Sequence, residues 1–106
     1  DYSWVINPHK SSPAVAAVLL HPRSGRELTV LTTQPAVHFY SGHLLDEKIN
    51  SNDEKSEFGK NAGLCLETQH FPDSPNHSGF PDTIIRPGET YSEETIFRFS
   101  ISGKTA

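Results

Sequence analysis

Apolar and polar positions alternate with a period of two through much of the chain, a spacing that places the two kinds of side chain on opposite faces of a strand. The sharpest example is segment 95–101. Its more polar positions are Ile96, Arg98 and Ser100, and they alternate with the apolar positions Phe97, Phe99 and Ile101. This segment predicts a half-buried antiparallel strand with its aromatic side chains facing inward.

Similar patterns predict further strands at 1–6, 14–20, 27–33 and 36–40, and the beginning of a strand at 83–85. Segment 14–20 is almost wholly apolar, which indicates a buried strand, although so short a run also fits a helical turn. Pro22 and Gly25 lie between 14–20 and 27–33 at turn spacing, so these two strands are predicted to form a hairpin. Because every predicted element is a strand bounded by Pro or Gly, the fold class is all-β and sandwich-like.

The stretch 63–76 changes from an apolar run to a polar cluster, Pro-Asp-Ser-Pro-Asn, that neither a strand nor a helix accommodates. Alternation places Leu64 and Leu66 on one face and Cys65 and Glu67 on the other, with Cys65 predicted as a small buried residue. A carboxylate at the end of a buried strand, before an irregular loop, is typical of a reactive group. A solvated glutamate at a strand end is the alternative. Asp73 and Asn76 have side chains suited to capping the backbone of their own loop, which is expected to position Glu67.

Length and composition limit the possible functions. The 106 residues are one domain or part of one, and the hydrophobic content of 34% suits a piece that completes a larger core. A net charge of −4 argues against nucleic acid as a partner. No apolar run approaches the roughly 20 residues of a membrane span. No basic segment precedes an apolar stretch as in a signal peptide, and we expect a cytoplasmic location.

Charged residues crowd the segment 44–60, which predicts a long exposed loop, and 102–106 is expected to be a flexible tail. The six histidines and the single cysteine show no zinc-ligand spacing, so no metal or other cofactor is expected. His70 follows Glu67 by three positions and is either an exposed loop residue or a partner of that carboxylate. No nucleophile elbow or phosphate-binding glycine loop is present in the sequence.

The run from Cys65 to Asn76, Cys-Leu-Glu-Thr-Gln-His-Phe-Pro-Asp-Ser-Pro-Asn, resembles the signature of the aldose 1-epimerases, also called galactose mutarotases. Segments 30–42 and 85–91 resemble two other parts of that family, and the similarity extends from about Asp1 to about Ser100. The resemblance implies a large antiparallel β-sandwich of the galactose mutarotase type, with 1–106 as its C-terminal portion.

The same resemblance implies a role for three residues. Glu67 matches the glutamate that acts as general base when the anomers of an aldohexose, such as galactose or glucose, are interconverted. Asp1 matches a substrate-binding aspartate, although Tyr2 replaces the histidine that usually follows it. His38 stands where the family usually has a glutamine that contacts a sugar hydroxyl, and an imidazole also forms hydrogen bonds.

The family's acid is a histidine, helped by a second one, and both lie upstream of the aspartate segment. Nothing in this chain matches those motifs, so we expect it to lack activity alone and to require the N-terminal part of the same enzyme as partner. A non-catalytic carbohydrate-binding β-module is an alternative from another class. An epimerase of hexose 6-phosphates is a third, but it needs a basic clamp, and the arginines show no clustering: Arg23, Arg26, Arg86 and Arg98.

Overall fold

The computed structural model describes residues 1–7, 11–45 and 59–102. Six β-strands and one short 3₁₀-helix, η2 (Ser74–Asn76), lie in these ranges. The strands are β1 (Tyr2–Val5), β2 (Ala14–His21), β3 (Arg26–Thr32), β4 (Ala36–Tyr40), β5 (Cys65–Gln69) and β6 (Thr95–Ile101). The all-β prediction is confirmed, as are the predicted strands that these six match. The charged segment within 46–58 and the tail 103–106 lie outside the described residues.

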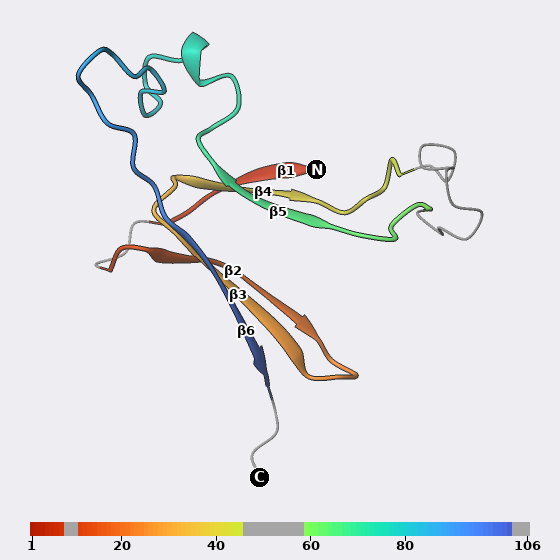
Figure 1. The fold of residues 1–106 in the computed structure, drawn as a ribbon. Helices are drawn as coiled ribbons and strands as arrows, with labels where there is room; N and C mark the ends of the chain where they lie inside the picture. The colour runs from red at the N-terminus through yellow and green to blue at the C-terminus, as the bar shows by residue number, and fades with distance from the viewer. Residues whose placement is uncertain (8–10, 46–58, 103–106) are drawn as a thin grey trace, which may run out of the picture.

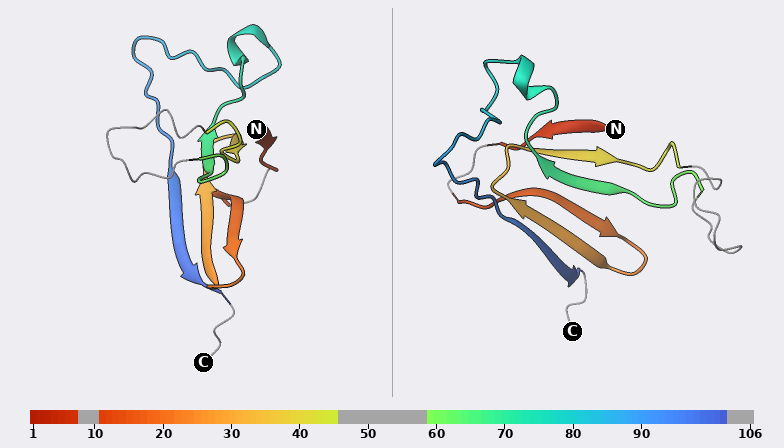
Figure 2. Two further views of the ribbon diagram at one scale, coloured as in Figure 1. Left: turned by 90° about the vertical axis from the view of Figure 1, so that its right-hand side faces the viewer. Right: turned by 45° about the horizontal axis from the view of Figure 1, so that its top comes forward.

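The strands form two antiparallel sheets of three strands each, in the orders β1-β4-β5 and β2-β3-β6. The sheets meet where β3 passes into β4 and diverge from there (Figure 1). The segment that follows β5 lies at the opposite end of the molecule from the end of β6 (Figure 2). Two antiparallel sheets, without helices between them in the described ranges, agree with the predicted β-sandwich class.

Glycines at two turns allow the backbone to approach a neighbouring strand. Gly25, in the confirmed β2–β3 hairpin, has a φ of 70°, and a Cβ there would lie 2.6 Å from the carbonyl oxygen of Ser102. Gly42, just after β4, has a φ of 73°, and a Cβ there would collide with the carbonyl oxygen of Gly63. The Asn61 N–H also donates to the Gly42 carbonyl at 2.8 Å, so the two ends of the 43–60 segment are joined at Gly42.

The core is small and lies where the two sheets converge. Its buried apolar residues are Val30, Ala36 and Val37. Phe97 shares a face with Val30 through the β3–β6 register, yet it is 52% exposed, and Phe99 is 78% exposed. The prediction that these aromatic side chains are covered is therefore wrong, because the sheets have diverged at this point and no described residue packs over them.

Three further predictions from the apolar pattern are wrong. Strand β2 is not buried along its length, since Val18 is 58% and Leu20 46% exposed. Cys65 is exposed rather than buried. No strand forms at 83–85, because no neighbouring strand pairs with it; instead the side chain of Asp82 accepts a hydrogen bond from the Ile84 N–H at 2.9 Å. The predicted turn that follows is present, with the Glu89 N–H donating to the Arg86 carbonyl at 3.0 Å.

A chain of three threonine hydroxyls joins the two sheets. The Oγ1 atoms of Thr68 on β5 and Thr95 on β6 lie 2.7 Å apart, and those of Thr95 and Thr32 on β3 lie 2.9 Å apart. Thr32 donates to the Glu94 carbonyl at 3.1 Å. Since each hydroxyl carries one proton, the chain is satisfied when Thr68 donates to Thr95 and Thr95 donates to Thr32. The central hydroxyl of Thr95 is therefore a polar link between the sheets.

We expect Thr95→Val to lower the free energy of unfolding by about 1–3 kcal/mol, because it leaves the hydroxyls of Thr32 and Thr68 without their shared partner. Thr95→Ser keeps the hydroxyl and should cost much less. Urea unfolding of the two variants beside the wild type measures the difference. Equal stabilities of the Val and Ser variants would contradict a structural role for this hydroxyl.

Candidate functional site

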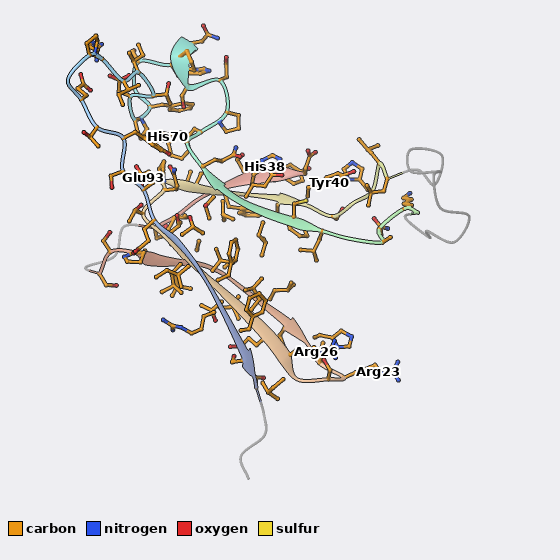
Figure 3. All side chains as sticks on the ribbon, in the orientation of Figure 1. Arg23, Arg26, His38, Tyr40, His70 and Glu93 are labelled. Atoms are coloured by element: carbon orange, nitrogen blue, oxygen red, sulfur yellow. The ribbon has the colours of Figure 1, made fainter. Side chains whose placement is uncertain are left out.

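The predicted site residues gather on one face of the sheet β1-β4-β5. In its register His38 on β4 lies opposite Ser3 on β1 and opposite Glu67 on β5. Residues paired in this way point to the same face, with Cβ atoms about 4.5–5.5 Å apart. Figure 3 shows His38 on the side of this sheet that faces away from β2-β3-β6. The imidazole therefore lies between the side chains of the two outer strands.

Both nitrogens of the His38 ring have a partner on β1 or just before it. Nδ1 lies 2.7 Å from the Ser3 Oγ, and Nε2 lies 3.4 Å from the Asp1 Oδ2. The side chain of His38 is 21% exposed, while that of Asp1 is 51% exposed and open to solvent. The fold thus brings Asp1 and His38 into contact and sets Glu67 beside them. The sequence analysis missed Ser3, although its period-two spacing from Asp1, just before β1, is a signal that it shares this face.

Glu67 points outward from the sheet and its side chain is exposed. The prediction of a carboxylate at the end of a buried strand is therefore wrong for the described residues, because no second layer covers this face. The backbone beneath it is nevertheless held, since the next residue, Thr68, points inward to the threonine chain. Alternation along β5 keeps Glu67 on the face of His38 while Thr68 binds the other sheet.

The loop after β5 is held by its own polar groups. Asp73 has a left-handed φ of 60° and accepts hydrogen bonds from the Asn76 Nδ2 at 2.5 Å and from His77 at 3.0 Å. The hydroxyl of buried Ser74 donates to the Phe71 carbonyl at 2.5 Å. Asp73 and Asn76 therefore bind each other and stabilise the loop that begins three residues after Glu67.

Beyond this loop a polar hollow of about 430 Å³ is lined by His70, residues 82–85 and residues 89–93. His70 thus lines this hollow, and Figure 3 shows it near Glu93. The hollow is held against the end of β3, because the Gln34 amide donates to the Tyr91 hydroxyl at 2.6 Å and Thr33 donates to Glu93. The wall of the hollow is therefore fixed to the β3–β4 connection.

One carboxyl of this hollow has a shifted pKa. The Ile84 N–H binds Asp82 and is the main reason that its pKa lies below the usual range, with Arg86 adding to the effect. Arg86 lies 3.5 Å from the Asp82 carboxylate and 3.9 Å from that of Glu89. The positive charge of Arg86 is thus shared between two carboxylates.

Within 1–7, 11–45 and 59–102, no three His, Cys, Asp or Glu side chains come together in a way that would hold a metal ion. In the part of the chain that the structure describes, no helix has the length and apolar character needed to cross a membrane.

Known proteins resemble this chain along nearly all of its length. A family model described as aldose 1-epimerase matches residues 1–98. Over 102 residues the chain is 42% identical to the galactose mutarotase of Mus musculus and 45% identical to that of Homo sapiens, covering 96% of this chain and 29% of each relative. It is 36% identical to the aldose 1-epimerase of Escherichia coli (strain K12), covering 93% of this chain and 29% of the relative. The chain therefore spans less than a third of the length of these curated relatives.

We expect Asp82 to titrate below the usual range of an aspartate in a carbon-13 NMR titration. Its lowered folded-state pKa means that its contribution to stability is present above the unfolded pKa and is lost as the pH falls through the folded value. The Ile84 amide signal should shift in the same acid step. Arg86→Gln should raise the Asp82 pKa only partly, since the Ile84 N–H remains, and an unshifted Asp82 in the wild type would contradict this arrangement.

Proposed function

Because the chain belongs to the aldose 1-epimerase family, we propose that it supplies the base-bearing face of a mutarotase site. The substrate is an aldohexose such as galactose or glucose, whose α and β anomers are interconverted. The observation that carries the proposal is the pairing of Glu67 with His38 on one face of the sheet, together with the contact of His38 with Asp1 just before β1. Such a row of polar groups suits a sugar, which presents several hydroxyls at once.

In this proposal Glu67 is the general base. It takes the proton from the hydroxyl on the anomeric carbon. The electron pair of that O–H bond then forms the carbonyl, while the bond between the anomeric carbon and the ring oxygen breaks. The ring oxygen gains a proton from an acid, the C1–C2 bond rotates, and the aldehyde closes again on its other face. Asp1 and His38 lie on the face that receives the sugar hydroxyls.

The acid, in this proposal, comes from the region that corresponds to the rest of the relatives' length. The uncovered apolar face of sheet β2-β3-β6 supports such a partner. Leu19 and Phe99 flank Leu28 in the register, and both outer side chains are exposed. Burying apolar area of this kind against a partner contributes roughly 25 cal/mol of favourable free energy per Å². We propose that the N-terminal part of the same enzyme covers it, either as a linked segment or as a separate chain.

A carbohydrate-binding β-module without turnover is the second candidate, and the exposure of Glu67 favours it. The hexose 6-phosphate alternative is less well supported. Arg23 and Arg26 lie at the β2–β3 hairpin, away from His38 (Figure 3), and Arg86 is already close to two carboxylates. These arginines do not form a phosphate clamp beside the proposed sugar site.

We expect Glu67→Gln, made in the protein that contains this chain and its N-terminal part, to lower kcat by roughly 10²- to 10⁴-fold while leaving sugar binding within about threefold. The amide keeps the shape of the side chain but does not accept the proton. Polarimetry follows the turnover, and calorimetry follows the binding. Glu27→Gln on the other sheet is the matched control and should retain the wild-type rate. A wild type that binds sugar without turnover would instead identify the binding module.

We expect the 106-residue chain by itself to show no mutarotase rate above buffer, because the proposed acid lies outside it. Polarimetry of freshly dissolved α-galactose or α-glucose, with and without the chain, is the measurement. Addition of the N-terminal part as a separate polypeptide is the control, and it should restore the rate. A rate well above buffer from the chain alone would contradict the division of the acid and base between two parts.

A further inference from the structure

The ring of His38 is held at both nitrogens, which determines what it offers to a ligand. We propose that Ser3, His38 and Asp1 form a hydrogen-bonded relay in which His38 is a positioning residue that orients the Asp1 carboxylate. Asp1, rather than the imidazole, then receives the sugar hydroxyl. The inference rests on the proposed function for its substrate, and it assigns Ser3 a part in sugar recognition.

The direction of each hydrogen bond follows from the donor capacity of the groups. An ionised carboxylate only accepts, so the contact between the Asp1 Oδ2 and the His38 Nε2 requires the proton on Nε2. A neutral imidazole has one N–H, so Nδ1 then presents a lone pair. The Ser3 hydroxyl, 2.7 Å away, is both donor and acceptor and therefore donates to Nδ1. Asp1 thus selects the tautomer, and Ser3 stabilises it by donating to Nδ1.

This arrangement leaves neutral His38 without a spare N–H for a sugar. The free capacity lies on Asp1, whose second carboxylate oxygen has no partner among the described side chains and whose side chain is 51% exposed. His38 itself is only 21% exposed, and its position is set by pairing with strands on both sides. The half-buried ring therefore fixes the exposed carboxylate.

Protonation of His38 preserves the relay. The cationic ring donates from both nitrogens, so Nδ1 donates to Ser3 after the hydroxyl rotates, and Nε2 still donates to Asp1. The charged and titratable groups that share this face are Asp1 just before β1, Tyr40 on β4 itself, and Cys65 and Glu67 on β5. Both protonation states therefore hold Asp1 in one orientation, which is the property expected of a positioning residue.

The test uses Ser3→Ala in the full-length protein, with Ser3→Thr as the conservative variant and Ser100→Ala on β6 as the matched control. Loss of one hydrogen bond should raise KM for the sugar by roughly three- to tenfold and leave kcat within about twofold, because the contact to Asp1 serves the ground state and the transition state alike. Ser3→Thr should keep the wild-type KM, and so should Ser100→Ala. An unchanged KM in Ser3→Ala, or a Thr variant that behaves like Ala, would overturn the relay.

Nitrogen-15 NMR of the His38 ring gives a readout that needs no turnover. The wild type should show a protonated Nε2 and an unprotonated Nδ1 at a pH where the ring is neutral, and Ser3→Ala, which loses the donor to Nδ1, should show a larger fraction of the Nδ1-protonated tautomer. A wild-type ring protonated at Nδ1 would overturn the relay. A wild type without mutarotase turnover but with the Nε2-protonated ring would remove the proposed function and leave the relay in place.

Discussion

The hydroxyl chain through Thr68, Thr95 and Thr32 is the contact on which the rest of the arrangement depends. It lies where the two sheets converge, next to a core of few buried apolar residues. Because Thr68 points inward, its neighbour Glu67 must point outward, and the β4–β5 register then sets that carboxylate opposite His38. The orientation of the proposed base thus follows from a polar link on the other side of its own strand.

Local patterns predicted much of the fold but little of the site. The alternation in 95–101 and the Pro22–Gly25 turn are signals within a few residues, and both predicted the elements that form. The site instead depends on pairing between distant segments, since Ser3 and His38 are 35 positions apart. The resemblance proposed roles for Asp1, His38 and Glu67 without their geometry, and it gave no role to Ser3.

The errors of the sequence analysis share a physical cause. Period-two alternation shows which side chains share a face, but it does not show what covers that face. Phe99 and Cys65 lie on the faces that their spacing predicts, and both are exposed because the described residues provide no layer over them. The apolar Thr83-Ile84-Ile85 segment has strand propensity without a partner strand, and a strand needs its ladder of hydrogen bonds.

Because of the contacts at Gly42, the geometry of the β4–β5 pair does not depend on how many residues lie between Gly42 and Asn61. Because Asn61 binds the Gly42 carbonyl and Gly63 approaches the same residue, the chain leaves and rejoins the β4–β5 pair at one fixed point. Closing a longer loop between such points costs only about 0.6 kcal/mol for each doubling of its length. The intervening segment is thus a place where insertions can accumulate during evolution, or be introduced by an engineer, without moving His38 from its position opposite Glu67.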